Sequence, residues 1–172
     1  MRDAVLRVIL WRHAKSAYPV GVPDIDRPLS DRGIRDAVAA RTHLTRLTHG
    51  GTSRVLMSSS RRTLETWAWA GCAVHDAHTK VDNSLYLASH DAIADLVAHE
   101  ITSQESGLDF LIVLAHDPGL HRIVLDLAGN DQGADIVRSK FPTNALALFE
   151  VTLMNNEVSL SGRLIDIAIP RG

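Results

Sequence analysis

The sequence predicts an α/β fold, a three-layer sandwich in which a mostly parallel sheet carries helices on both faces. Short segments rich in Val, Ile and Leu alternate with longer segments whose apolar residues recur at helical spacing. The short segments are apolar at consecutive positions, as is typical of strands buried on both faces of a parallel sheet. Because strand and helix patterns alternate along the chain, we expect helices to cover both faces of the sheet.

Six segments are expected to be strands. They are residues 5–11, 54–57, 79–81, 110–115, 145–151 and 164–169. The clearest is 110–115, which reads FLIVLA. The last two segments follow each other without an intervening helix pattern, so they could form a hairpin at one edge of a mixed sheet.

Four segments between these strands have the pattern of helices. The first begins after Ser30, a residue type that caps helices, and continues to about residue 48, where Gly50 and Gly51 end it. The others are 61–72, 91–101 and 118–127, the last of which begins with a proline. Residues 17–29 contain three prolines and a glycine and are expected to form a loop.

Length and composition favour one globular domain over residues 1–172. Hydrophobic residues make up 45% of the chain and charged residues 22%, and the formal net charge is −2. This balance argues against nucleic-acid and membrane-surface partners.

The single cysteine, Cys72, excludes an internal disulfide framework, and we expect it to be a buried apolar filler. No apolar run approaches the roughly 18 residues of a membrane helix, and the first residues lack a secretion-signal pattern, so we expect a soluble, cytoplasmic protein. The oligomeric state leaves no readable trace.

Polar and charged residues follow three of the predicted strands directly. Arg12 and His13 follow the first strand, Arg61 and Arg62 the second, and His116 the fourth. Ligands of open α/β sheets bind at the carboxyl ends of the strands. We therefore expect these side chains to meet at one edge of the sheet.

Arginine and histidine together suit the chemistry of a phosphoryl group. The guanidinium group offers a planar fork of donors that matches phosphate oxygens. A neutral imidazole can attack phosphorus and form a covalent phosphohistidine, and neighbouring guanidinium groups disfavour the imidazolium form. The amino-terminal ends of the helices that follow Ser60 and Asp117 add peptide N–H donors.

These motifs resemble those of the histidine phosphatase superfamily, which has the phosphoglycerate mutase-like fold. The resemblance lies in the pair Arg12-His13, in Arg62 followed by Thr63 and Thr66, and in His116 within LIVLAHDPGL. The segments DIDRPLSDRG at 24–33 and FPTNA at 141–145 are similar to the SixA-like phosphohistidine phosphatase branch. The matches extend over nearly the whole chain, from about residue 5 to residue 150.

The resemblance implies roles for individual residues. His13 is implied as the nucleophile, and Arg12, Arg62 and His116 as the groups that bind the phosphoryl group and stabilise its transition state. Arg61 is the rival of Arg62, but the spacing to Thr66 favours Arg62. Lys15 and Ser16 are further phosphate-binding candidates, although ordinary loop residues are an equal alternative. No metal and no cofactor are implied.

Two departures from the family pattern stand out. Ala14 replaces the glycine that usually follows the Arg-His pair. In addition, larger members of the superfamily carry a carboxylate general acid after the third strand, whereas residues 83–88 here (NSLYLA) contain none. The imidazole of a phosphohistidine is a far better leaving group than an alkoxide, so it depends less on an acid. This departure therefore favours phosphohistidine, unless Asp91 or Asp117 reaches the site.

Three functions follow as alternatives. The first is a metal-independent phosphatase that removes phosphate from phosphohistidine in a partner protein by way of a covalent intermediate. The second is a phosphatase of small phosphoesters, such as sugar or nucleotide phosphates, and the third is a phosphate-pocket protein that binds without turnover. The loop 17–29 is expected to border the pocket and to influence substrate choice. His75 and His78 lack the further ligands of a metal site and are expected at the surface.

Overall fold

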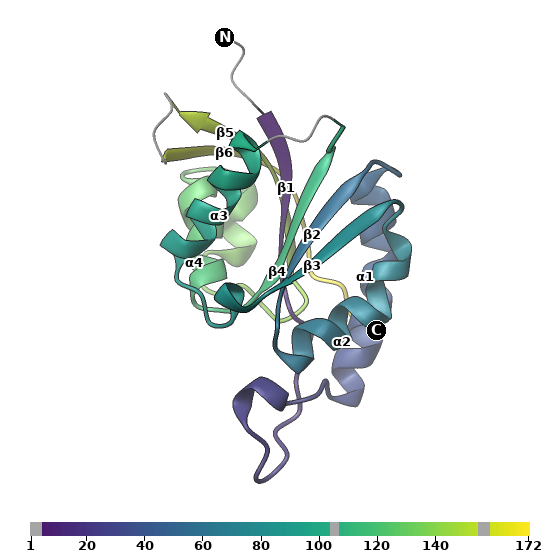
Figure 1. The fold of residues 1–172 in the computed structure, drawn as a ribbon. Helices are drawn as coiled ribbons and strands as arrows, with labels where there is room; N and C mark the ends of the chain where they lie inside the picture. Colours follow the sequence, from purple (N-terminus) through teal and green to yellow (C-terminus); the bar gives the residue numbers. More distant parts are fainter. Residues whose placement is uncertain (1–4, 104–106, 155–158) are drawn as a thin grey trace.

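The computed structural model describes residues 5–103, 107–154 and 159–172. In these residues a six-stranded sheet lies between two layers of helices, which confirms the expected α/β sandwich (Figure 1). The strands are β1 (Val5–Arg12), β2 (Ser53–Ser58), β3 (Ala77–Asp82), β4 (Phe110–Ala115), β5 (Leu146–Met154) and β6 (Ser159–Ala168). Each contains most or all of a segment that the sequence predicted.

The helices also lie where the sequence placed them. They are α1 (Asp31–Thr48), α2 (Arg61–Ala70), α3 (His90–Thr102) and α4 (Gly119–Ala128). Four 3₁₀ turns, which periodicity did not reveal, are η1 (Asp24–Asp26), η2 (Gly71–Ala73), η3 (Asn83–Leu85) and η4 (Gln132–Val137). Ser30, Ser60 and Ser89 cap the first three helices, each through its side-chain oxygen. Across the residues described, no helix is both long and apolar enough to cross a membrane.

The order of the strands across the sheet is β3-β2-β4-β1-β5-β6. The first four strands in this order are parallel, whereas β5 is antiparallel to β1, and β6 is antiparallel to β5. The expected hairpin of the last two strands is therefore confirmed, with β6 at the edge. The three strands that end in Arg and His residues, β2, β4 and β1, are neighbours in the middle of the sheet.

Because side chains along the central strands alternate in direction, there is one apolar core on each face of the sheet. In β1, Val8 and Leu10 belong to the core beneath α3 and α4, while Ile9 and Trp11 belong to the core beneath α1 and α2. Figure 1 shows these two helix pairs on opposite sides of the sheet. Because successive side chains of a strand point to opposite faces, a strand that is apolar throughout must be covered on both.

Cys72 is exposed, so the expectation that it fills the core is wrong. Helix α2 ends at Ala70, two residues before the cysteine, and the chain continues as the turn η2. The predicted helix ran to residue 72 and would have kept the helical repeat to that point. Since the repeat stops earlier, Cys72 does not lie on the buried face.

Asn144 fastens the end of β1 to the rest of the molecule. Its side chain accepts a hydrogen bond from Trp11 Nε1 (3.2 Å) and donates to the carbonyl oxygens of Asp36 (2.7 Å) and Pro170 (3.2 Å). Its backbone has a φ of 64°, in the left-handed region that asparagine tolerates better than most residues. The residue is completely buried, so each of these polar groups depends on it.

We expect Asn144→Ala to lower the free energy of unfolding by about 2–4 kcal/mol, because it leaves the buried Trp11 N–H without an acceptor and places alanine at a positive φ. Urea unfolding of the variant and of wild type measures the difference. Asn130→Ala, in an exposed turn, is the matched control and should change stability by less than about 0.5 kcal/mol. A loss no larger than that of the control would show that Asn144 is dispensable.

Candidate active site

The backbone of Arg12 and His13 is held between β4 and the start of β5. The Arg12 N–H donates to Ala145 O (3.0 Å), and the His13 N–H donates to Ala115 O (3.2 Å). The N–H of Asn144 lies 3.1 Å from Arg12 O and 3.0 Å from His13 O. These bonds fix both residues at the carboxyl edge of the sheet, where the sequence predicted a site.

Arg62 contacts both histidines, which follow two different strands, β1 and β4. Its Nε lies 3.3 Å from His13 Nε2, and its Nη2 lies 3.3 Å from His116 Nδ1. The side chain is 4% exposed, whereas that of Arg61 is 56% exposed and pairs with Glu65 on the surface. The choice of Arg62 over Arg61 therefore agrees with the geometry.

His13 presents one unprotonated nitrogen to this guanidinium group. Its Nδ1 lies 2.7 Å from Ala14 O, which can only accept, so Nδ1 carries the proton. Nε2 then carries the lone pair and faces Arg62. The pKa of His13 is lowered to about 3, mainly by burial and to a smaller extent by the charges of Arg62 and Arg12. The ring is therefore neutral at physiological pH.

His116 is a second neutral imidazole beside the first. Its Nδ1 accepts from Arg62, and its Nε2 lies 2.7 Å from Ser58 Oγ, to which it donates. Burial, followed by the charge of Arg62, lowers its pKa to about 3. The centroids of the His13 and His116 rings are 5.1 Å apart. Both histidines thus hold defined tautomers beside the same guanidinium group.

Arg12 lies at the other side of this cluster. Its Nη1 donates to Phe141 O (2.6 Å) and pairs with Asp117 Oδ2 (2.6 Å). Burial raises the pKa of Asp117, while Arg12 opposes the rise. Arg12 Nε and Asp117 Oδ1 are buried and have no hydrogen-bond partner within the described residues. A buried polar atom without a partner is costly in most positions, and such atoms concentrate at sites that bind ligands.

Asp24, Arg27 and Tyr86 complete the cluster, although the sequence predicted none of them as a site residue. Asp24 binds Arg62 through its carbonyl oxygen (2.6 Å) and its carboxylate (3.0 Å). The carboxylate also accepts from Tyr86 Oη (2.7 Å) and from Arg27 Nη1 (2.7 Å). The hydrogen bond from Tyr86, together with both arginines, lowers the pKa of Asp24 to about 2, so the carboxylate is ionised.

Signals for two of these residues were present in the sequence. Asp24 and Arg27 stand three positions apart in the segment that carried the family resemblance and within the loop expected to border the pocket. Tyr86 lies in residues 83–88, where the family pattern concerns a carboxylate and gives no signal for a tyrosine. Those residues indeed supply no acid, but Asp24 and Asp117 approach from other segments. Asp91 does not approach, since its side chain is 81% exposed and lies next to His90.

Lys15 and Ser16 differ in what they do. Ser16 is buried, and its hydroxyl accepts a hydrogen bond from Arg27, so it serves a contact within the protein. Lys15 lies at the rim, with its ammonium group 5.5 Å from the centroid of the Tyr18 ring. Of the two, Lys15 has the position of a group that could meet an anion.

The cluster lines a pocket of about 170 Å³. Its walls come from the ends of β1 and β4, the start of α2, the loop 17–29 and three other segments; the lining residues are Arg12, His13, Lys15, Ser16, Tyr18, Arg27, Arg62, Leu87, His116, Asp117 and Thr143. The expectation that loop 17–29 borders the pocket is confirmed. A small anion would meet up to four cationic side chains here, so the arrangement suits a phosphoryl group.

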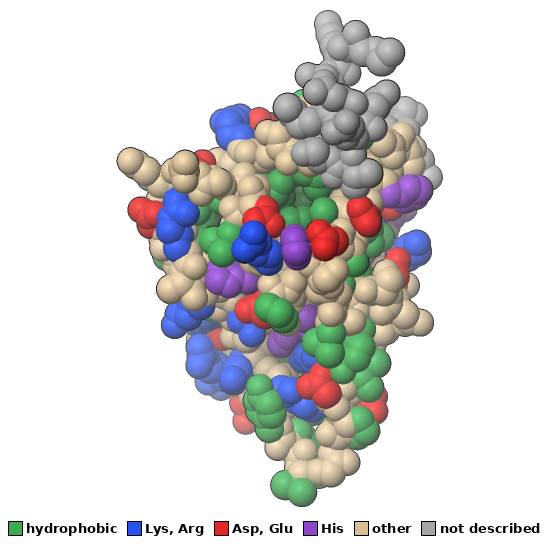
Figure 2. Space-filling model, turned by 90° about the vertical axis from the view of Figure 1, so that its left-hand side faces the viewer, with side chains coloured by type: hydrophobic (Ala, Val, Ile, Leu, Met, Phe, Trp, Pro, Cys, Tyr) green, Lys and Arg blue, Asp and Glu red, His purple; other side chains and the backbone are tan. Residues whose placement is uncertain are grey.

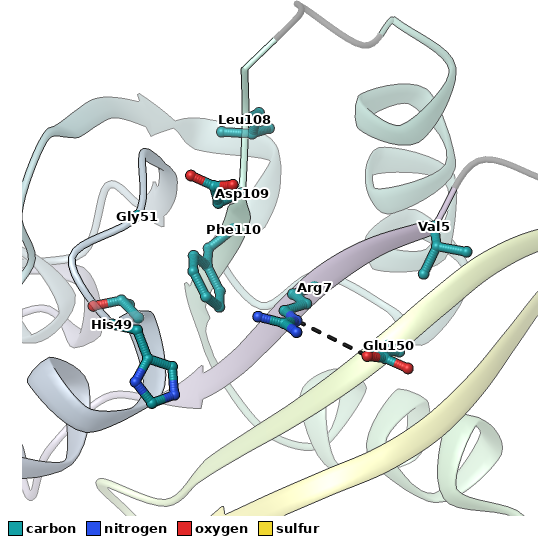
Figure 3. A pocket seen from close by; sticks show the side chains of 9 residues that line it. Val5, Arg7, His49, Gly51, Leu108, Asp109, Phe110 and Glu150 are labelled. Carbon is teal, nitrogen blue, oxygen red and sulfur yellow. Dashed lines mark ion pairs between the residues drawn. The ribbon is translucent and has the colours of Figure 1, made fainter.

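A larger hollow of about 570 Å³ lies at the opposite edge of the sheet, at the start of β1 and β4 (Figure 3). There the Arg7 side chain points toward Glu150, 3.9 Å away, and Asp109 accepts from the Thr52 N–H. Its charged groups therefore already have partners. It also lies at the amino ends of the strands, whereas open α/β sheets bind ligands at the carboxyl ends. Size does not identify the reactive site in this molecule.

No set of three or more His, Cys, Asp or Glu residues in the described parts of the chain could hold a metal ion. His75 and His78 are both exposed, as expected.

Comparison with known proteins connects this geometry to a family. The family model of the histidine phosphatase superfamily (branch 1) matches residues 8–105. An uncharacterised protein of Mycobacterium tuberculosis is 35% identical over 144 residues, which cover 81% of this chain and 86% of the relative.

Two solved structures show the same fold. A candidate SixA phosphohistidine phosphatase from Agrobacterium tumefaciens superposes with a TM-score of 0.77 at 23% identity, covering 96% of this chain and 98% of the other. A mycobacterial glucosyl-3-phosphoglycerate phosphatase superposes with a TM-score of 0.67 at 17% identity, covering 97% of this chain and all of the other.

The ring signals of His13 and His116 should stay constant between about pH 5 and pH 8, because both pKa values lie near 3 instead of the usual 6.5. NMR titration measures this, with His13→Gln and His116→Gln to assign the signals. In the unfolded chain both rings take up protons near pH 6.5. Stability therefore falls as the pH drops from about 6.5 towards 3. A midpoint near pH 6.5 for either ring in the folded protein would contradict the neutral pair.

Proposed function

Because the chain belongs to the histidine phosphatase superfamily, we propose that it removes phosphate from phosphohistidine in a partner protein by way of phosphorylated His13. The observation that carries this proposal is the neutral His13, whose unprotonated Nε2 accepts a hydrogen bond from Arg62 Nε inside a small cationic pocket. A nucleophile needs a free electron pair, and burial supplies it here by suppressing protonation.

The first step transfers the phosphoryl group to the protein. The lone pair of His13 Nε2 forms a bond to phosphorus as the P–N bond of the substrate breaks. The electron pair of that bond stays on the leaving nitrogen. When the other ring nitrogen of the substrate carries a proton, the leaving group is neutral imidazole and needs no acid from the protein. Arg12, Arg62 and His116 surround the pocket where charge builds up on the equatorial oxygens.

The second step releases phosphate. Water attacks the phosphorus atom of phosphorylated His13, the P–N bond breaks, and the electron pair returns to Nε2. The Nδ1–H group donates its hydrogen bond to Ala14 O in both steps, so the ring keeps its orientation between them. One water is consumed, and inorganic phosphate leaves.

Two features of the pocket support phosphohistidine as the substrate. Residues 83–88 offer no acid, and Asp24 is ionised, so it cannot protonate an alkoxide. The volume of about 170 Å³ suits a phosphoryl group with one small ring. Both features fit a leaving group that is compact and departs without an acid.

A small phosphoester is the second candidate, and one residue favours it. Asp117 lines the pocket, and burial raises its pKa, so it is the carboxyl group best placed to protonate an alkoxide. Its ion pair with Arg12 opposes that role by favouring the ionised form. We therefore rank phosphohistidine first.

We expect His13→Ala to reduce turnover by about 10³-fold or more, because it removes the attacking atom. Phosphate release is measured from a histidine-phosphorylated protein and, in parallel, from an aryl phosphate. Acid-quenched wild type should also carry a phosphoryl group that the variant lacks. Arg61→Ala, which changes an exposed neighbour of the cluster, is the matched control and should retain activity.

The outcomes separate the candidates. Release that depends on His13 and favours the phosphoprotein supports the proposal. Release from the ester alone moves the substrate to small phosphoesters. Binding of the phosphoprotein without release from either substrate indicates a binding protein and contradicts the enzymatic proposal.

Asp24→Asn should strengthen inhibition by inorganic phosphate by about three-fold or more, because the Asp24 carboxylate occupies guanidinium donors of Arg62 and repels an incoming anion. The asparagine keeps the size of the side chain and the carbonyl contact of residue 24. Competitive inhibition constants for phosphate, measured with an aryl phosphate substrate, report the change. Weaker inhibition in the variant would mean instead that Asp24 mainly positions Arg62 for phosphate.

A further inference from the structure

Most of any substrate must remain outside the pocket. Pockets that enclose small molecules commonly measure about 300–1,000 Å³, whereas this one measures about 170 Å³. The pocket therefore holds the phosphoryl group and at most one small ring. Whatever carries that group lies against the rim, and the residues there meet it.

The rim is apolar where it is most exposed. Tyr18 and Leu87 line the pocket and are 70% and 55% exposed. Val20 and Ile25, in the same loop as Tyr18, are also exposed. This loop, between β1 and α1, projects beyond the sheet edge in Figure 1. Figure 2 shows hydrophobic side chains together with Lys and Arg over the same projecting end of the molecule.

Leu87 has a backbone conformation that does not suit leucine. Its φ is 52°, in the left-handed region. The other non-glycine residues with positive φ in the described chain are His49, Asp76 and Asn144, all of residue types enriched in this region. Leucine is not such a type, and strain of this kind gathers at functional sites. The local fold therefore offers no reason for a leucine side chain at this exposed position.

The neighbours of Leu87 in the chain, Leu85 and Ala88, pack this segment against the core. Leu85 is 1% exposed, and Ala88 is also buried, so both belong to the core. Leu87 turns away from the core and lines the pocket mouth. Its side chain is thus available to something outside the protein.

Tyr18 is held firmly at the mouth by two cations. The Arg27 guanidinium lies 3.5 Å from the centroid of its ring, and the Lys15 ammonium lies 5.5 Å from it. A ring fixed in this way presents apolar area with little loss of conformational freedom on binding. Arg27 is paired with Asp24, so Lys15 is the cation beside the ring that is complementary to a negatively charged partner.

We infer that Tyr18 and Leu87 bind the protein surface around the phosphohistidine and select a phosphoprotein over free phosphohistidine. The inference rests on the proposed function and names the part of the substrate that the rim contacts. The matching surface is apolar next to the phosphorylated histidine and carries an acidic side chain opposite Lys15, because Arg27 is already paired with Asp24. Free phosphohistidine has no such surface to place against the exposed parts of the Tyr18 and Leu87 side chains.

The test compares two substrates in Leu87 variants. One is a small folded protein with a single surface histidine, phosphorylated by phosphoramidate, and the other is free phosphohistidine. In Leu87→Gly and Leu87→Asn, kcat/KM for the phosphoprotein should fall about five- to ten-fold more than for free phosphohistidine, mainly through KM, because apolar contact area is lost. Glycine and asparagine both tolerate a positive φ, so neither substitution should lower Tm.

His49→Gly is the matched control. It also replaces a residue at a positive φ, but it lies after α1 at the opposite edge of the sheet. It should leave the ratio of the two kcat/KM values unchanged. A change of the same size in this variant would show that relief of backbone strain, and not the Leu87 side chain, sets the ratio.

Wild type and variants separate the possible failures. Equal losses for both substrates in the Leu87 variants would overturn the inference while leaving the proposed function intact. Release of phosphate by wild type from an aryl phosphate, but from neither phosphohistidine substrate, would overturn the proposed function and this inference with it. A selective loss for the phosphoprotein with unchanged Tm supports the rim as a partner contact.

Discussion

The charge of one buried guanidinium group organises the site. Arg62 is nearly inaccessible to water, and an isolated buried cation is costly, so it must have anionic or polar partners. Both histidines beside it are neutral and offer only lone pairs. Asp24 supplies the opposite charge, and the loop that carries it is therefore drawn over the carboxyl edge of the sheet.

The position of Arg62 in turn depends on the start of α2. Ser60 caps this helix and Thr63 bonds to Ser58 O, so the first turn begins directly at the end of β2. Thr66 accepts from the Ala14 N–H and donates to Arg62 O, which ties the helix to the turn after β1. The threonines that carried the family resemblance are therefore the residues that join Arg62 to His13.

The sequence predicted the fold and the four central residues because both depend on local patterns. Arg12, His13, Arg62 and His116 follow apolar strands or begin a helix, and strand ends of a parallel sheet meet at one edge. Asp24, Arg27 and Tyr86 could not be placed in this way. Their positions depend on the course of a proline-rich loop and a 3₁₀ turn, neither of which has a period to read. Cys72 has a different explanation, because Gly71, which caps the end of α2, is a stop signal that the predicted helix 61–72 passed over.

The tautomers of the two histidines show a further limit of sequence reasoning. The sequence indicated that guanidinium groups would keep His13 neutral, and the structure adds burial as the larger cause. Which nitrogen carries the proton follows only from the Ala14 carbonyl and, for His116, from Ser58. These contacts depend on where the folded chain places the Ala14 carbonyl and the Ser58 hydroxyl, and no residue pattern specifies that placement.

The central place of β1 has a consequence for how the protein is made. β1 pairs with β4 on one side and β5 on the other, and Trp11 is bonded to Asn144, 133 residues later in the chain. During synthesis, the segment with His13 therefore emerges well before β4, β5 and Asn144, on which its position depends. Contacts between such distant residues form slowly. An incomplete chain can contain His13, but it cannot hold that histidine in a reactive pocket.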